Sequence, residues 1–269
     1  MLRQRVITAC VLALIALWVV LKLPAAGFGA VLLAVVLLCA WEWAGLAGLA
    51  QPRGRLLYSG LALAPILAVW PLTGHAAFMT GMMVLVLVAW CAVLAWLWRY
   101  AGRPERQDPP LVIGAAGVAA LATAWAALMG LRNEFGSGHV LFLLMLIWVA
   151  DIGAYFAGRR WGRRKLAPTI SPGKTWEGVW GAAAATLVFA LLGAAALEVG
   201  SRWPGFVALC LVTAGFSIVG DLFESMMKRQ RGVKDSGALL PGHGGALDRL
   251  DSLIAAAPVF LLGWHGLTG

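Results

Sequence analysis

The chain alternates long runs of apolar residues with short polar connections. Nine runs are long enough to form helices that satisfy their own backbone hydrogen bonds inside a lipid bilayer. They cover Val6–Leu21, Phe28–Ala50, Leu56–Leu72, Ala76–Trp98, Leu111–Leu131, His139–Gly158, Trp176–Leu197, Pro204–Gly220 and Ser252–Leu267. We expect an all-α polytopic integral membrane protein with about nine transmembrane helices, so that the two termini lie on opposite sides.

Composition agrees with this pattern. Apolar residues make up 61% of the chain and charged residues only 12%, whereas a soluble domain has about 25% charged residues. A soluble globular protein is therefore excluded, and the short connections leave no room for a large extramembranous domain. We divide the chain into an N-terminal region of about four spans, residues 1–110, and a catalytic region of about five spans, residues 111–269.

The basic residues are unevenly distributed between the two sets of connections. The net charge of +9 is compatible with nucleic-acid binding, but in so apolar a chain it fits better the excess of Lys and Arg in cytoplasmic loops. With the N-terminus in the cytoplasm, 18 of the 21 Lys and Arg residues are cytoplasmic, and only Lys22, Arg132 and Arg202 are outside. We therefore expect a cytoplasmic N-terminus, an external C-terminus and no nucleic-acid partner.

Two features of the chain have alternative interpretations. The first apolar run follows Arg3 and Arg5 and resembles a cleaved signal peptide, but a retained first span fits the charge alternation downstream. The four cysteines show no C-x-x-C spacing, so neither a zinc site nor a disulfide framework is supported.

The connection 159–175 has six basic residues and no acid, and should attract polyanions. Gly173-Lys174-Thr175 resembles a P-loop, but position 168 is Pro168, where that motif requires Gly. We expect instead a Ser-Pro turn followed by a helix with Thr175 as its N-cap, beside Lys174, an arrangement suited to phosphate. An ordinary capped helix behind a basic loop is the alternative.

The connection 221–251 contains five of the 12 carboxylates and five basic residues. On a helix, Asp221, Glu224, Ser225 and Lys228 share one side. Between this segment and the last span, Pro241 to Gly245 forms a glycine-rich turn around His243. We expect backbone in this turn to approach a ligand closely.

Asp248 and Asp251 open the last span and, at i and i+3, point the same way. Oxygen ligands from two helix ends suit a hard cation such as Mg²⁺, which is held by a few carboxylates together with substrate phosphates. We therefore assign Asp221, Asp248 and Asp251 as metal ligands. Salt bridges among these side chains are the alternative.

Two further acids lie within predicted spans, where ionisable groups are costly and usually functional. Asp151 lies about 10 Å below the cytoplasmic end of its span at 1.5 Å per residue, and we expect it to line the same cytoplasmic cavity. Glu42, between Trp41 and Trp43, is at least as well explained as a structural partner for another helix.

These motifs resemble those of one family, the phosphatidate cytidylyltransferases, also called CDP-diacylglycerol synthases. Ser171-Pro172-x-Lys174-Thr175-x-Glu177-Gly178 and Trp41-Glu42-Trp43 resemble shared segments of that family, and Ala246 and Gly173 are departures from its pattern. The main resemblance is the run Ser225-x-x-Lys228-Arg229-x₄-Lys234-Asp235-x-Gly237-x₃-Pro241-Gly242-His243-Gly244-Gly245-x-x-Asp248-Arg249-x-Asp251.

The resemblance implies the reaction CTP + phosphatidate → CDP-diacylglycerol + pyrophosphate in the bacterial cytoplasmic (inner) membrane, with the active site facing the cytoplasm. It also implies Mg²⁺, a second, monovalent ion such as K⁺, and a homodimer. The catalytic residues are then Asp221, Asp248, Asp251, Lys228 and His243. The substrate-binding residues are Ser171, Lys174, Thr175, Glu224, Ser225, Arg229, Lys234, Asp235, Arg249 and Asp151.

Three other functions fit the sequence less well. A CTP-dependent polyprenol or lipid-alcohol kinase would attack the γ-phosphorus of CTP rather than the α-phosphorus. A transporter or flippase would carry paired acids near the bilayer midplane, whereas most acids here cluster at one face. The D-x-x-D-G-x-x-A-R pattern of CDP-alcohol transferases is absent.

Overall fold

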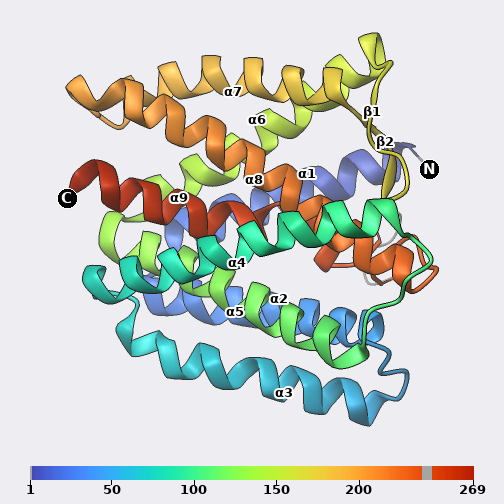
Figure 1. Cartoon of the computed structure of the whole chain (residues 1–269). Coiled ribbons are helices and arrows are strands. Elements are labelled where there is room, and N and C mark those ends of the chain that lie inside the picture. Colours follow the sequence, from blue (N-terminus) through green and yellow to red (C-terminus); the bar gives the residue numbers. More distant parts are fainter. Residues whose placement is uncertain (1, 238–243) are drawn as a thin grey trace.

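The computed structural model describes the backbone of residues 2–237 and 244–269, and the side chains from residue 11 onward within those ranges. Each of the nine predicted apolar runs forms an α-helix, and the helices lie side by side in a bundle (Figure 1). Their bounds are α1 Leu2–Lys22, α2 Ala25–Leu46, α3 Pro52–Val69, α4 Ala76–Gly102, α5 Pro110–Phe135, α6 Ser137–Trp161, α7 Trp176–Ala196, α8 Trp203–Gln230 and α9 Leu253–Thr268. Three short 3₁₀ helices are η1 Trp70–Leu72, η2 Gly200–Arg202 and η3 Leu247–Arg249.

Seven of the described helices are long and apolar enough to cross a membrane, which makes the chain a polytopic membrane protein. They are α2, α3 with η1, α4, α5, α6, α7, and η2 with α8. The described part of α1 and the whole of α9 are shorter apolar helices. Nine full crossings therefore remain a prediction.

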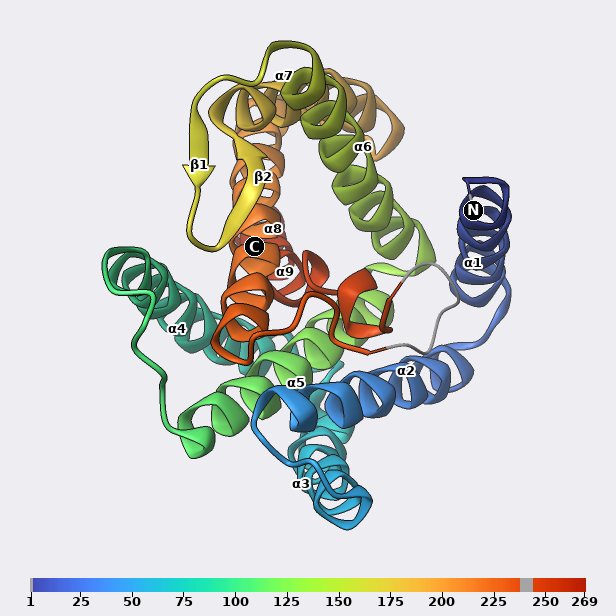
Figure 2. The ribbon, with the colours of Figure 1, turned by 90° about the vertical axis from the view of Figure 1, so that its right-hand side faces the viewer.

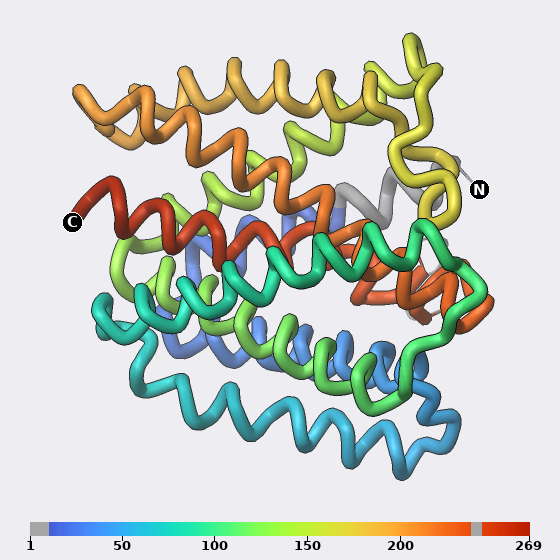
Figure 3. Tube along the Cα trace, in the orientation of Figure 1, coloured from blue at the N-terminus to red at the C-terminus, as the bar shows by residue number. Residues whose placement is uncertain are grey.

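Successive helices run in alternating directions, so the connections fall at two ends of the bundle (Figure 3). One end, which we call the hairpin end, holds the α2–α3, α4–α5, α6–α7 and α8–α9 connections, and the C-terminus lies at the other (Figures 1 and 3). At that opposite end Arg132 donates to the carbonyls of Val20 and Leu23, and Arg202 donates to that of Leu267. Both arginines thus bind carbonyls at helix C-termini, where cations are favoured.

Helix α9 lies in the interior and packs against α8, α5 and α4. Near the hairpin end, Phe223 of α8 is surrounded by aromatic rings, with ring centroids 5.5 Å from Trp43, 5.6 Å from Trp90 and 5.7 Å from Trp96. Three helices therefore meet around one buried side chain, and this packing fixes α8 relative to α2 and α4.

Helices α6 and α7 form a closely packed pair (Figure 2). A Cβ atom on Gly153 would lie 2.6 Å from the carbonyl oxygen of Gly181, and one on Gly178 would lie 3.1 Å from that of Ala154. Small residues allow two helix backbones to approach in this way inside a membrane. The pair holds the α6–α7 connection in place.

The expected Ser-Pro turn in that connection is wrong, because residues 171–175 form a strand. Strand β1, Lys165–Ala167, pairs antiparallel with β2, Ser171–Thr175, with Lys165 opposite Thr175. The amide of Trp176 also donates to the carbonyl of Arg164 at 2.9 Å, so the hairpin is closed where α7 begins. The result is a small β-hairpin that leans against α8 (Figure 2).

Candidate active site

Helix α8 carries the centre of the site. It continues ten residues beyond the predicted apolar run, which ends at Gly220, to Gln230. It places Asp221, Glu224, Ser225 and Lys228 on one face, as the spacing predicted. Ser225 Oγ donates to Asp221 Oδ1 at 3.2 Å, and Lys228 Nζ lies 2.5 Å from Glu224 Oε2. Glu224 is fully buried, so the Lys228 ammonium compensates a carboxylate that has no access to water.

The hairpin brings a second lysine to this face. Lys174 Nζ on β2 lies 2.6 Å from Asp221 Oδ2. Thr175 is the N-cap of α7, as predicted, since its Oγ1 accepts from the Gly178 amide at 3.2 Å. Arg229 Nε donates to the carbonyl of Ile170 at 3.0 Å, which ties the hairpin to the end of α8.

Asp248, in η3, is held by four donors. Its Oδ1 accepts from Lys228 Nζ at 2.7 Å. Its Oδ2 accepts from the amides of Gly245 at 2.7 Å and Ser236 at 3.1 Å, and from Ser236 Oγ at 3.0 Å. Burial opposes ionisation, but the bonds from Lys228 and Gly245 prevail, and the pKa of Asp248 is lowered. Asp248 is therefore an ionised carboxylate that organises the chain around it.

Two more acids face the same region. The carbonyl of Asp251 packs directly against Gly220, where a Cβ would clash with it. Burial and then the negative charge of Asp221 raise the pKa of Asp251 to about 7. Asp151 of α6 is near enough to Asp221 and Lys174 for their charges to act on its carboxyl group, and its role in lining a common cavity stays a prediction.

Glu42 of α2 also belongs to this cluster, a contact that the sequence analysis did not assign to the site. Its Oε1 accepts from the Ala246 amide at 3.1 Å, and its Oε2 from the Leu247 amide at 2.8 Å. Ser236 Oγ lies 3.2 Å from Glu42 Oε2. The available signal was the position of Glu42 within an apolar span, which favoured a role as an interhelical partner.

Four acids gather in this region. Asp221, Glu224, Asp248 and Asp251 lie around the ammonium groups of Lys174 and Lys228. No three His, Cys, Asp or Glu side chains of the described residues are close enough to enclose a metal ion by themselves. Two carboxylates with substrate phosphates are nevertheless an ordinary Mg²⁺ environment, and the adjacent Asp221 and Asp251 fit that donor set.

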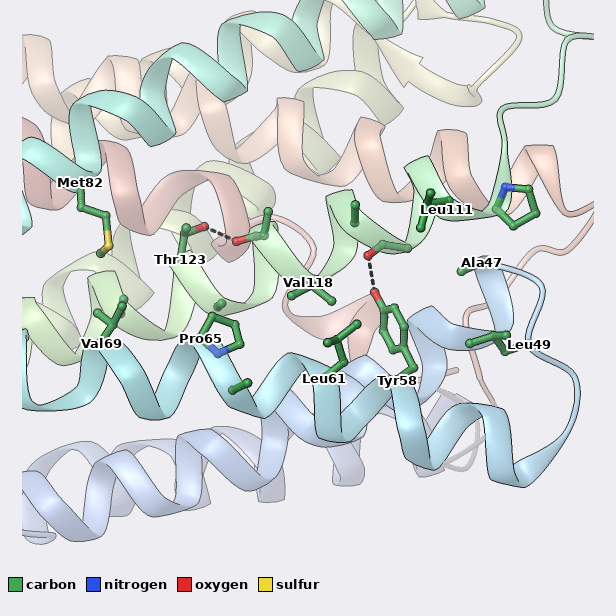
Figure 4. A pocket seen from close by; sticks show the side chains of 17 residues that line it. Ala47, Leu49, Tyr58, Leu61, Pro65, Val69, Met82, Leu111, Val118 and Thr123 are labelled. Atoms are coloured by element: carbon green, nitrogen blue, oxygen red, sulfur yellow. Dashed lines mark hydrogen bonds between the residues drawn. The ribbon is translucent and has the colours of Figure 1, made fainter.

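A cavity of about 740 Å³ lies elsewhere, between α3 and α5 (Figure 4). Tyr58, whose hydroxyl donates to the Gly114 carbonyl at 2.7 Å, forms part of its lining with Leu61, Pro65, Val69 and Met82. Its walls are almost entirely hydrocarbon, and it shares no residue with the charged cluster. It is therefore unsuited to bind phosphate.

Comparison with known proteins identifies the family of the chain that carries this charged cluster. The chain matches the cytidylyltransferase family over residues 3–265. It belongs to that family. It is 44% identical to the phosphatidate cytidylyltransferase of Pseudomonas aeruginosa, with 97% of this chain and 96% of the relative covered. It is 38% identical to the enzyme of that name from Haemophilus influenzae, with 97% of each chain covered. It is 39% identical to the one from Brucella suis, with 97% of this chain and 92% of the relative covered.

In this cytidylyltransferase the remaining predicted residues lie around the cluster. Ser171 is half-buried on β2, Arg249 is exposed on η3, and Lys234 and Asp235 are exposed in the turn after α8. Arg229 is exposed as well, and its hydrogen bond to the Ile170 carbonyl supports the hairpin. His243 lies outside the described residues, so its role stays a prediction.

Proposed function

We propose that the chain is a phosphatidate cytidylyltransferase, which converts CTP and phosphatidate into CDP-diacylglycerol and pyrophosphate. The observation that carries this proposal is the 44% identity to an enzyme of that name over 97% of the chain. Because the similarity extends over both regions of the chain, it includes the hairpin, α8 and η3 together.

The proposed site is at the hairpin end of the bundle, and that end faces the cytoplasm of a bacterial inner membrane. Two observations support this. The start of α1 and the four connections at the hairpin end together contain 18 of the 21 Lys and Arg residues, and such residues concentrate on the cytoplasmic side. Phosphatidate presents its phosphate at headgroup level and CTP is cytosolic, so both reach this surface.

The chemistry is an in-line attack by a phosphatidate oxygen on the α-phosphorus of CTP, with pyrophosphate leaving. Both reactants are anions, so catalysis consists mainly of positioning and charge neutralisation. Lys174 and Lys228 place ammonium groups on the two sides of the α8 face and contact the phosphates, assisted by Arg229 and Lys234. The phosphatidate nucleophile is already ionised near neutral pH, so no general base is needed.

The gathering of carboxylates supports a cation, since a few carboxylates together with substrate phosphates are an ordinary Mg²⁺ environment. Asp221 and Asp251, with Asp248, would hold Mg²⁺, and K⁺ would occupy a second position. A bound Mg²⁺ would neutralise charge on the triphosphate. Glu224, buried against Lys228, keeps that lysine oriented until substrate arrives.

A homodimer is the proposed assembly. Support comes from large apolar side chains that remain exposed on α3 and α7, among them Leu57, Leu61 and Leu192. Such faces contact either lipid or another copy of the chain. Mass measurement of the purified protein, corrected for bound detergent, decides between one copy and two.

The decisive experiment supplies purified protein with phosphatidate, Mg²⁺ and CTP labelled at either the α- or the γ-phosphate, with and without K⁺. Cytidylyl transfer leaves the α-label in the lipid product and releases the γ-label as pyrophosphate. A lipid kinase gives the opposite result, and transfer of γ-label to lipid overturns the proposal.

A further inference from the structure

Glu42 is a carboxylate placed in a membrane helix, and its contacts are to one segment of backbone. It is only 5% exposed. It accepts from the amides of Ala246 and Leu247 at 3.1 and 2.8 Å, which belong to the N-cap and the first residue of η3. Free amides at a helix start favour a negative charge, so Glu42 caps η3 from another helix.

The chain approaches Glu42 closely at two glycines. A Cβ atom on Gly237 would clash with Glu42 Oε1, and one on Gly245 would clash with Oε2. Segments on both sides of the undescribed residues 238–243 therefore pack directly against the carboxylate. A larger residue at either position would push the backbone away from it.

Ser236 links Glu42 to the proposed active site. Its hydroxyl lies 3.2 Å from Glu42 Oε2 and 3.0 Å from Asp248 Oδ2, and its single proton serves one carboxylate at a time. Asp248 in turn accepts from Lys228. A continuous chain of contacts thus runs from α2 through Ser236 and Asp248 to α8.

Helix α2 also holds the start of the same connection. Arg231 Nε donates to the Leu46 carbonyl at 2.9 Å, and its guanidinium fills the space beside Gly48, where a Cβ would clash with it. The connection is therefore held by α2 both where it leaves α8 and where it enters η3.

We propose that Glu42 is a positioning residue: from α2 it fixes the start of η3, and through Ser236 it orients the Asp248 carboxylate toward Lys228. The expected effect on catalysis rests on the proposed function, whereas the capping of η3 by Glu42 does not. Placing an ionisable group in an apolar helix is costly, and here the cost is offset by ordering backbone that carries a site residue.

Glu42→Gln is the sharpest test, because the side chain keeps its shape while one oxygen becomes an NH₂ group that faces an amide donor. Without substrates, we expect hydrogen exchange at the amides of Ala246 and Leu247 to accelerate about tenfold or more. In turnover, we expect kcat to fall about 30-fold with KM for CTP within about threefold, since misplacement acts on the transition state.

Glu134→Gln is the matched control. Glu134 of α5 has a side chain that is 10% exposed and lies 2.9 Å from His265. It also loses a mostly buried carboxylate in this substitution, but it is remote from η3. It should leave exchange at Ala246 and Leu247 unchanged. Equal acceleration in both variants, or unchanged exchange and kcat in Glu42→Gln, overturns the inference.

Ser236→Ala keeps the inference testable if Glu42→Gln does not fold. It should lower kcat without accelerating exchange at Leu247, because Glu42 still accepts that amide. Unchanged kcat overturns the link through Ser236. If the wild-type protein makes no CDP-diacylglycerol, the proposed function fails, while the exchange measurement still decides the cap.

Discussion

Lys174 of β2 and Asp221 of α8 form an ion pair, with Nζ 2.6 Å from Oδ2. The two side chains are 25% and 29% exposed, so the pair stands at the open side of the charged cluster. An incoming phosphate can therefore replace Asp221 as the partner of the Lys174 ammonium, and the released Asp221 oxygen can then bind a cation. The pair is thus suited to exchange partners when substrate binds.

We expect Lys174→Met to lower kcat/KM for CTP about 100-fold, because a cation that faces developing phosphate charge is lost. Its effect on stability should be within about 1 kcal/mol, as for other partly exposed ion pairs. Lys165→Met, an exposed position on the same hairpin, is the control and should retain most activity. Equal losses in the two variants would indicate that only the overall charge of the hairpin matters.

The helices were predictable because the apolar runs are long, and because a chain segment in lipid must satisfy its backbone hydrogen bonds internally, as a helix does. Even the common face of Asp221, Glu224, Ser225 and Lys228 followed from helical spacing. The predicted apolar run ends at Gly220, because hydropathy falls at Asp221, but α8 continues to Gln230. Within this continuation Glu224 and Lys228 form an ion pair.

The hairpin and the role of Glu42 were not predictable from local pattern. Strand β2 contains Pro172 and Gly173, which disfavour strands, and its position depends on Arg229, more than fifty residues away. The amide partners of Glu42 are about two hundred residues distant. Contacts of this kind are set by tertiary packing and leave no periodic signal.

Asp248→Asn should abolish CTP-dependent formation of the liponucleotide while the protein stays folded in detergent. The amide loses the negative charge, and its NH₂ group faces either Lys228 or the two backbone amides at the other oxygen. Product formation is followed with α-labelled CTP, and folding by size-exclusion profile and circular dichroism. Retained turnover would contradict both the metal role and the orienting role of Asp248.

Removal of divalent cations should stop the reaction. Because Asp221, Asp248 and Asp251 are the proposed Mg²⁺ ligands, we expect EDTA to reduce activity below detection and excess Mg²⁺ to restore it. Ca²⁺, which accepts looser coordination, should restore much less. Full activity in EDTA would show that the acids serve only as salt-bridge partners.

Lys228→Met should destabilise the fold far more than Lys174→Met. The Lys228 side chain is 11% exposed and lies against both Glu224 and Asp248, and removing it leaves buried negative charge uncompensated, at a cost of about 3–5 kcal/mol. Unfolding by denaturant in mild detergent measures this loss. Arg99→Met, which breaks the more exposed pair with Asp108, should cost about 1 kcal/mol or less.

Single cysteines decide which end of the bundle faces the cytoplasm. In a variant with Cys10, Cys39, Cys91 and Cys210 replaced, Arg164→Cys lies at the hairpin end and Ser201→Cys at the other, both at exposed positions.

In intact spheroplasts, a membrane-impermeant maleimide should label Ser201→Cys and leave Arg164→Cys unlabelled until the membrane is permeabilised. The physical reason is that translocating the Arg-rich hairpin end is disfavoured, and that cytosolic CTP must reach Lys174. Labelling of Arg164→Cys before permeabilisation would place Lys174 and Asp221 outside the cell. The reaction proposed for this chain would then have no access to its nucleotide.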